Sequence, residues 1–259
     1  MKTLQYGLIG AKLGHSYSKQ IHEMITDYHY ELLELTNEEL VEFMMNKPFK
    51  GINVTIPYKE AVLPYLDQID EKAAAIGAVN TIVIRDGKAC GYNTDYLGFD
   101  YTLRHNNIVV NDKKVLILGY GGAAKAVHEV IKDHKAKEIV LVNRSVKPGT
   151  ITFDACYQSH TDADVIINTT PVGMYPNIEE SPLSLGSFNQ LSAVIDIIYN
   201  PRETKLLLEA KGLGITAVNG MEMLVAQAVK AAEKFSQNLF SDKLIEDICE
   251  KFCEKVKSF

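Results

Sequence analysis

Short apolar runs alternate with amphipathic stretches along most of the chain, which predicts alternating strands and helices. Before residue 98, the runs LQYGLIG, ELLELT and INVTI predict strands. We expect helices to begin near Ser18 and at Pro57, because proline suits the first position of a helix. The stretch AVNTIVIRDGKACGYN predicts a hairpin that turns at Asp86 and Gly87.

The pattern after residue 98 is more regular. The runs VLIL, EIVLV, DVIIN, AVIDII and GITAV predict buried strands, and the segments between them are long enough to cross over a parallel sheet. We therefore predict an α/β fold of two lobes. Residues 1–97 form an α/β domain, residues 98–220 a Rossmann-type domain with a doubly wound parallel sheet, and residues 221–259 helices that return to the first lobe.

The composition narrows the possible functions. The 259 residues are 46% hydrophobic and 23% charged, with a net charge of −6, which argues against nucleic acid as the main partner. The N-terminal apolar run is too short for a signal peptide and no run is long enough to span a membrane, so we expect a cytoplasmic protein. The four cysteines, Cys90, Cys156, Cys249 and Cys253, form no CxxC pair, and no histidine lies near the last two. We therefore expect four free thiols and no metal site.

A glycine-rich motif follows the first predicted strand of the second lobe. Residues 119–124 read GYGGAA and fit the fingerprint G-x-G-x-x-A between a strand and a helix, the context typical of dinucleotide binding. Gly119 permits a tight turn, Gly121 lets the backbone approach a pyrophosphate, and Ala124 lets helix and strand pack closely. The N-terminus of the helix stabilises the anion.

The end of the next strand indicates which dinucleotide is bound. An NAD enzyme usually carries Asp or Glu there, to accept hydrogen bonds from the ribose hydroxyls. This chain has Asn143, Arg144 and Ser145, with Lys147 just beyond. Two cations and two polar side chains suit a 2′-phosphate, and Arg144 can also stack on adenine. The sequence therefore favours NADP over NAD.

Polar residues of the first lobe lie where core packing does not require them. Asn53 and Thr55 alternate along a predicted strand and share one face. Asn80 follows in GAVNT. In GHSYS, Ser16 and Ser18 precede a helix, so Ser18 is either its N-cap or one of two hydroxyls that bind a carboxylate.

A lysine occupies an unfavourable position in the same lobe. Lys59 is expected in the first turn of the helix that begins at Pro57, where the helix dipole disfavours a cation. This position is explained if the charge serves chemistry rather than helix stability. Asp95 opens another predicted helix, either as its cap or as a functional carboxylate. Gln227 lies on an apolar helical stripe, where its buried amide needs partners.

Taken together, these motifs resemble those of the shikimate dehydrogenase family. GHSYS, GINVTIPYKE, GAVNT, NTDYLG, GYGGAA, NRS, NTTPVGM, DIIYNPRET and NGMEMLVAQA occur in that family's order and spacing, from residue 7 to about residue 235. The resemblance implies a substrate domain made of the first lobe and the C-terminal helices, and an NADP(H) domain in the middle. It implies reversible reduction of 3-dehydroshikimate to shikimate, on the route to chorismate and the aromatic amino acids.

The resemblance also implies roles for individual residues. Lys59 and Asp95 correspond to the catalytic pair beside the reacting oxygen. The expected substrate contacts are Ser16, Ser18, Thr55, Asn80, Asp95, Tyr199 and Gln227. Asn53 is added because it shares a strand face with Thr55. The expected cofactor contacts are Gly119, Tyr120, Gly121, Gly122, Ala123, Asn143, Arg144, Ser145, Ile197 and Gly220, to which the charge pattern adds Lys147.

The chain departs from the family pattern at three places. Lys19 replaces a proline after GHSYS, and Glu222 replaces a glycine close to the expected nicotinamide site. Residues 145–164 contain Pro148, Gly149 and β-branched residues where the family has a full helix. We therefore expect the adenosine end of the cofactor site to be unusual or mobile.

Three other functions fit parts of this pattern. One is a quinate/shikimate dehydrogenase that uses NAD, which the segment from Asn143 to Ser145 argues against. Another is a methylenetetrahydrofolate dehydrogenase, which would not need the serine pair of GHSYS. The third is an inactive NADP-binding regulator, which does not explain why Lys59 and Asp95 are retained. The chain is expected to be a monomer or a homodimer.

Overall fold

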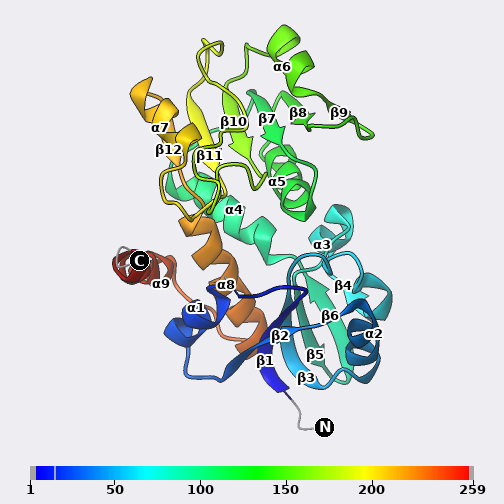
Figure 1. Cartoon of the computed structure of the whole chain (residues 1–259). Coiled ribbons are helices and arrows are strands. Elements are labelled where there is room, and N and C mark those ends of the chain that lie inside the picture. Colours follow the sequence, from blue (N-terminus) through cyan, green and yellow to red (C-terminus); the bar gives the residue numbers. More distant parts are fainter. Residues whose placement is uncertain (1–3, 15, 257–259) are drawn as a thin grey trace. The chain divides into compact units, whose positions relative to one another are not determined.

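The computed structural model describes residues 4–14 and 16–256, and it divides into two compact units (Figure 1). Unit 1 comprises Met1–Gly98 and Val225–Phe259, and unit 2 comprises Phe99–Leu224. Each unit has its own sheet with helices against it, so the prediction of a two-lobe α/β fold is confirmed. Two helices cross the boundary between the units, α4 (Thr94–His105) and α8 (Met221–Ser236).

Unit 1 contains a mixed sheet in the order β2-β1-β3-β5-β6-β4. Its strands are β1 (Leu4–Gly10), β2 (Tyr30–Glu34), β3 (Phe49–Val54), β4 (Gln68–Ile69), β5 (Thr81–Arg85) and β6 (Lys88–Tyr92). β1 pairs in parallel with β2 and β3, whereas β5 is antiparallel to both β3 and β6. The predicted hairpin is present, and Asp86 and Gly87 have the positive φ angles that a two-residue turn of this kind requires (50° and 74°).

The helices of unit 1 come from both ends of the chain. They are α1 (Ser18–Ile25), α2 (Asn37–Asn46), the 3₁₀ helix η1 (Leu63–Tyr65), α3 (Glu71–Ile76) and α9 (Asp242–Val256). Helix α1 packs against α9. The last turn of α8 is held on the sheet, because the Arg85 guanidinium donates to the carbonyl of Lys234 at 2.8 Å and the ring of Phe235 lies against Gly51.

The helix expected from Pro57 is absent, and this prediction was wrong. Residues 56–62 form consecutive turns that lead into η1. In an α-helix the carbonyl of Lys59 would accept from the N–H of Leu63. Here the N–H of Leu63 donates to Glu60, and the Lys59 carbonyl accepts instead from the N–H of Val79 at 2.8 Å. A hydrogen bond to a distant segment thus replaces the helical one.

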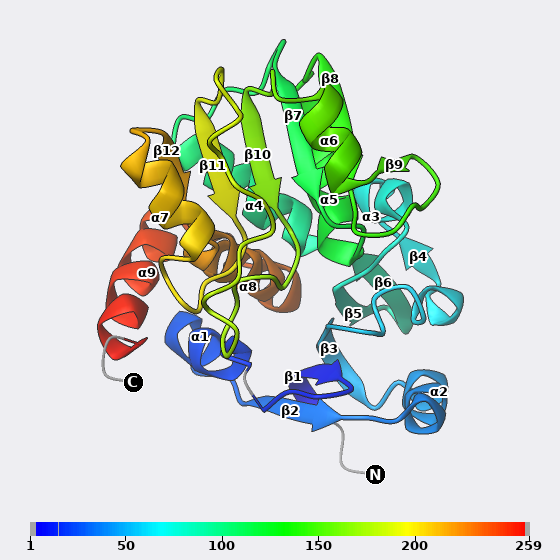
Figure 2. The same ribbon diagram turned by 45° about the horizontal axis from the view of Figure 1, so that its top comes forward.

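Unit 2 contains a fully parallel sheet in the order β12-β11-β10-β7-β8-β9. Its strands are β7 (Lys114–Leu118), β8 (Glu138–Val142), β9 (Thr150–Ile151), β10 (Val165–Asn168), β11 (Ala193–Asp196) and β12 (Thr216–Val218). Helices α6 (Phe153–Ser159) and α7 (Lys205–Gly212) cover one face, and α5 (Gly122–Asp133) covers the other (Figure 2). The predicted doubly wound Rossmann-type sheet is confirmed.

Both faces of this sheet are buried, as expected for parallel strands. Leu116 and Leu118 of β7 pack in one cluster with Leu206 and Leu207 of α7. Val115 and Ile117, which alternate with them along β7, are fully buried as well. The carboxyl ends of the strands are where such sheets bind ligands, so this core positions the loops that follow β7, β8 and β10.

The unusual segment 145–164 contains more regular structure than expected. The N–H of Thr150 donates to the carbonyl of Lys147, and Gly149 has φ +75°, which closes a tight turn around Pro148. Strand β9 follows this turn and extends the sheet beside β8. Helix α6 is then capped by the hydroxyl of Thr152, so the segment forms a short strand and a helix of seven residues.

No helix in the described parts of the chain combines the length and the apolar character that crossing a membrane requires.

Candidate functional site

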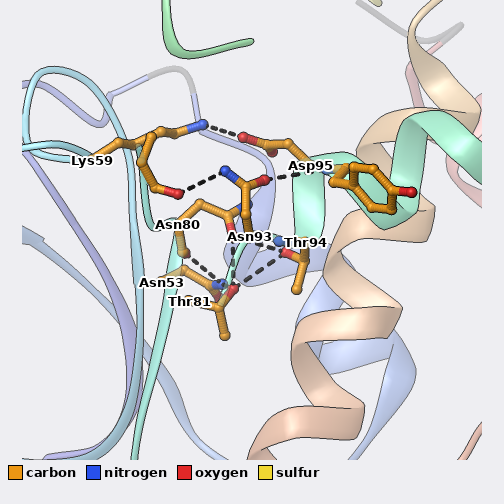
Figure 3. Close-up of polar contacts among 9 residues, drawn as sticks. Asn53, Lys59, Asn80, Thr81, Asn93, Thr94 and Asp95 are labelled. Atoms are coloured by element: carbon orange, nitrogen blue, oxygen red, sulfur yellow. Dashed lines mark hydrogen bonds and ion pairs between the residues drawn. The ribbon is translucent and has the colours of Figure 1, made fainter. Parts of the chain in front are cut away.

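The central feature of unit 1 is a close pair formed by Lys59 and Asp95. The Nζ of Lys59 lies 2.5 Å from Oδ2 of Asp95 (Figure 3), and the two side chains are 17% and 11% exposed. The low exposure reduces screening by water, so this pair interacts more strongly than a surface ion pair. The lysine ammonium has three donors, of which Asp95 uses one.

Each member of the pair is placed by a different element. Lys59 lies in the turns after β3, and Asp95 is the second residue of α4. Asp95 does not cap this helix. The cap is Asn93, whose side-chain oxygen accepts from the N–H of Tyr96 at 3.2 Å. Asp95 in the first turn is favoured by the positive end of the helix dipole, which leaves its carboxylate for Lys59.

A buried polar network lies beside this pair. Oδ1 of Asn80 accepts from the N–H of Thr94 at 2.7 Å and from the hydroxyl of Thr81 at 3.0 Å. Asn53 accepts from the hydroxyl of Tyr30 at 2.7 Å and donates to the hydroxyl of Thr81 at 2.9 Å. These bonds join the end of β3, the start of β5 and the start of α4, so Asn53 and Asn80 are also structural residues.

Sequence reasoning missed three members of this network, Thr81, Asn93 and Thr94. Asn93 directly precedes α4, which is a recognisable N-cap signal, whereas the cap predicted for this helix was Asp95. The two threonines lie in a strand and a helix and give no local signal. Thr55 lies one residue beyond the end of β3, and its N–H donates to the carbonyl of Ile9 at 2.9 Å.

Two hydroxyls meet at the start of α1. Oγ of Ser16 lies 3.2 Å from Oγ of Ser18 and accepts from the N–H of Ser18 at 3.3 Å. The helix begins at Ser18 itself, with Tyr17 at the N-cap position, so the alternative of Ser18 as an N-cap is wrong. The structure thus brings together the two serines that the sequence paired.

The remaining predicted substrate residues come from both units. Gln227 lies in the part of α8 that belongs to unit 1 and is half-buried. Tyr199 lies in unit 2, three residues after the end of β11, and is half-buried as well.

The glycine-rich motif of unit 2 has the predicted strand–turn–helix form. Gly119 follows β7 with φ +115°, and a Cβ added there would lie 2.6 Å from the hydroxyl oxygen of Thr169. Gly121 caps α5, and a Cβ at this position would meet no atom within 4 Å, so the space beside its backbone is open. Gly122 and Ala123 are the first residues of α5, with Tyr120 38% exposed before them. This backbone can cradle a phosphate.

The predicted 2′-phosphate residues lie directly after β8. The side-chain amide of Asn143 donates to the carbonyl of Ser145 at 2.8 Å, which shapes the loop. Arg144 and Lys147 are exposed, and within the described residues neither forms an ion pair. Because the N–H of Gly119 donates to the carbonyl of Val142 at 2.8 Å, this loop starts beside the glycine turn.

Ile197 and Gly220, both predicted near the nicotinamide, are in contact. The N–H of Gly220 donates to the carbonyl of Ile198 at 3.0 Å. A Cβ at Gly220 would lie 1.9 Å from the carbonyl oxygen of Ile197, so only glycine fits this approach. Glu222, two residues on, accepts from the side-chain amide of Asn106 at 2.6 Å and lies 3.2 Å from Nδ1 of His105. Its carboxylate is therefore tied to the end of α4.

A second buried polar cluster supports the loops of unit 2. The carboxylate of Asp196, fully buried at the end of β11, accepts from Asn168 at 3.0 Å, from the N–H of Ile198 at 3.1 Å and from the hydroxyl of Thr204 at 2.7 Å. Burial raises the pKa of Asp196 to about 6, although these hydrogen bonds favour the ionised form.

The described residues contain no cluster of three or more His, Cys, Asp or Glu side chains that could hold a metal ion. Cys90, Cys156 and Cys249 are free thiols. The side chain of Cys253 lies outside the described residues.

Comparison with known proteins places this geometry in a family. Residues 8–82 match the profile of the shikimate dehydrogenase substrate binding domain. The chain is 42% identical to the shikimate dehydrogenase (NADP(+)) of Clostridium beijerinckii over 267 residues, which cover 97% of this chain and 99% of that enzyme. It is 41% identical to the shikimate dehydrogenase (NADP(+)) of Clostridium perfringens, over 95% and 97% of the two chains.

Solved structures of shikimate dehydrogenases have the same fold as this chain. A chorismate mutase/shikimate 5-dehydrogenase fusion protein from Clostridium acetobutylicum superposes with a TM-score of 0.93 at 40% identity, covering 100% of both chains. The Thermus thermophilus shikimate 5-dehydrogenase, solved with NADP(H) and shikimate, matches with a TM-score of 0.85 at 28% identity, over 96% and 99% of the chains. Since relatives above 40% identity cover almost its full length, the chain belongs to the shikimate dehydrogenase family.

Proposed function

We propose that this protein catalyses the NADPH-dependent, reversible reduction of 3-dehydroshikimate to shikimate, a step in aromatic amino acid biosynthesis. The observation that carries the proposal is the Lys59–Asp95 pair in unit 1 of a chain whose relatives are NADP-dependent shikimate dehydrogenases. The nucleotide, when bound, supplies a hydride to the substrate carbonyl carbon.

Lys59 is the proton donor of this reaction. As the carbonyl carbon gains hydride, negative charge develops on its oxygen, and an ammonium within hydrogen-bond reach stabilises that charge. Lys59 then transfers one proton to the oxygen and is reprotonated from water; in the reverse direction it accepts the proton. Asp95, 2.5 Å away, orients the amine by accepting its hydrogen bond.

The polar residues of unit 1 bind the substrate. The adjacent hydroxyls of Ser16 and Ser18 are suited to a carboxylate, which accepts hydrogen bonds from both. Amide and hydroxyl side chains are suited to the ring hydroxyls, which both donate and accept; these are Asn53, Thr55, Asn80 and Gln227. The role of Tyr199, which lies in unit 2, as a substrate contact stays a prediction.

Unit 2 binds NADP(H). The backbone from Gly119 to Ala123 receives the pyrophosphate at the N-terminus of α5, where N–H groups and the helix dipole favour an anion. The exposed guanidinium of Arg144 pairs with the 2′-phosphate, supported by Ser145, Asn143 and Lys147. Ile197 and Gly220 border the nicotinamide.

A steady-state assay with both nucleotides and both polyols tests this function. We expect a shikimate-dependent rise in NADPH absorbance, with NADP preferred over NAD. Preferred oxidation of quinate with NAD would support the quinate/shikimate alternative instead. If neither polyol is oxidised but NADP still binds, the inactive regulator is the better description, and turnover of methylenetetrahydrofolate would identify the remaining alternative. The cytoplasmic location and the monomeric or dimeric state stay predictions.

A further inference from the structure

One peptide group links the two elements that carry Lys59 and Asp95. The carbonyl of Ala78 accepts from Nδ2 of Asn93 at 2.9 Å. The N–H of Val79, which belongs to the same peptide group, donates to the carbonyl of Lys59 at 2.8 Å. A peptide group is planar and rigid, so these two hydrogen bonds form a strut between Asn93 and Lys59.

The other side-chain atom of Asn93 holds the second element. Its Oδ1 accepts from the N–H of Tyr96 at 3.2 Å and caps α4, which carries Asp95 two residues further on. Asn93 is 4% exposed, and Ala78 and Val79 are fully buried, so water does not compete for these bonds. A peptide N–H also becomes a better donor when its own carbonyl accepts a hydrogen bond.

We infer that Asn93 is a positioning residue that sets the distance between Lys59 and Asp95. Its amide oxygen orients the first turn of α4, and its amide nitrogen, through the Ala78–Val79 peptide, anchors the backbone of Lys59. Asn80 supports the same junction from the other side, because its Oδ1 accepts from the N–H of Thr94 at 2.7 Å. This inference rests on the proposed roles of Lys59 and Asp95.

Two substitutions separate the two functions of Asn93. Asn93→Asp keeps the shape and the capping oxygen but replaces the donor to Ala78 by an oxygen, which repels that carbonyl. Asn93→Ser keeps a good capping residue and is too short to reach Ala78. Both variants therefore lose the strut and keep the cap. The matched control is Thr36→Ala, which removes the cap of α2 in the same unit, where the Thr36 hydroxyl accepts from the N–H of Glu39.

We expect kcat of both Asn93 variants to fall by about 10- to 100-fold, because small misplacements of a reacting group have effects of this size. KM for NADP should not change. Hydrogen exchange of the Val79 amide should become faster, a readout that does not depend on activity. Thr36→Ala should lower Tm and leave both kcat and Val79 exchange at wild-type values.

The inference is overturned if Asn93→Ser keeps normal kcat while Lys59→Ala is inactive, or if Thr36→Ala loses as much kcat at an equal loss of Tm. If Lys59→Ala itself turns over normally, the proposed roles of the pair fail instead. Wild-type protein gives a further test should both variants fail to fold. One Nδ2 proton of Asn93 must exchange slowly in its NMR spectrum, and fast exchange of both protons contradicts the strut.

Discussion

The amine of Lys59 lies 2.5 Å from the carboxylate of Asp95, although 36 positions separate them in the sequence. We predict that Lys59→Ala lowers kcat by about 10²- to 10⁴-fold with a modest change in KM, because proton transfer by a positioned group contributes that much. Steady-state kinetics of shikimate oxidation measure it. Lys50→Ala removes an exposed lysine of β3 and serves as the control, with expected wild-type turnover. Near-normal kcat in Lys59→Ala would remove this residue from the mechanism.

Arg144→Ala should change the preference between the two nucleotides. If Arg144 binds the 2′-phosphate as proposed, loss of the guanidinium removes a charge-assisted hydrogen bond of about 1.5–3 kcal/mol. KM for NADP should therefore rise by about 10-fold or more, and KM for NAD should stay within about twofold. Lys147→Ala should show the same effect at a smaller size. An equal rise of both KM values would mean that Arg144 acts on the loop and not on the phosphate.

Gly220→Ala should disrupt the turn between β12 and α8. The added Cβ would lie 1.9 Å from the carbonyl oxygen of Ile197, a backbone atom that cannot rotate away. Overpacking of this kind destabilises by about 1–3 kcal/mol or more. Chemical denaturation measures the loss. The control is Gly212→Ala at the end of α7, where the Cβ meets no atom within 4 Å and stability should hold or rise.

His22 should make unit 1 sensitive to acid. Burial lowers the pKa of His22 to about 3, and its Nδ1 lies 2.6 Å from the hydroxyl of Tyr28. In the unfolded chain, His22 binds a proton once the pH falls below its ordinary pKa of 6.5, whereas in the folded chain it does so only near pH 3. The stability that His22 contributes is therefore present above pH 6.5 and is lost as pH falls toward 3, by on the order of 5 kcal/mol at most.

Denaturation of wild type and His22→Gln between pH 4 and pH 8 tests this expectation. The glutamine variant is uncharged over the whole range, so its stability should depend less on pH than that of the wild type. Identical slopes for the two proteins would contradict the contribution of His22.

Asp196 should act with the opposite sign in unit 2. Its folded pKa of about 6 lies above the ordinary 3.8, so the folded chain holds a proton that the unfolded chain has already lost. This contribution is fully present below pH 3.8 and is lost as pH rises through about 6, by on the order of 3 kcal/mol. Asp196→Asn cannot ionise and should show a smaller fall in stability between pH 4 and pH 7. A fall as steep as in the wild type would refute the assignment.

Local sequence was sufficient for much of unit 2. The strand before Gly119, the turn and the helix after it depend on residues that are neighbours in the chain, and the buried runs identified each major strand of the parallel sheet. The two serines of GHSYS also meet because they are two positions apart. In both places, the residues that determine the local structure lie within one short segment of the chain.

Tertiary structure decided how Lys59 and Asp95 pair and what surrounds them. A helix after Pro57 was a reasonable local prediction, but the Lys59 carbonyl bonds to Val79, and this long-range hydrogen bond replaces the helical one. The sequence offered Asp95 as the cap of α4, but in the structure Asn93 caps this helix. Sequence alone predicted which residues carry the chemistry and determined which segments form the sheets. The partners of Lys59 and Asp95 were decided only by folding, because buried backbone groups take whichever donor or acceptor the packed structure brings within reach.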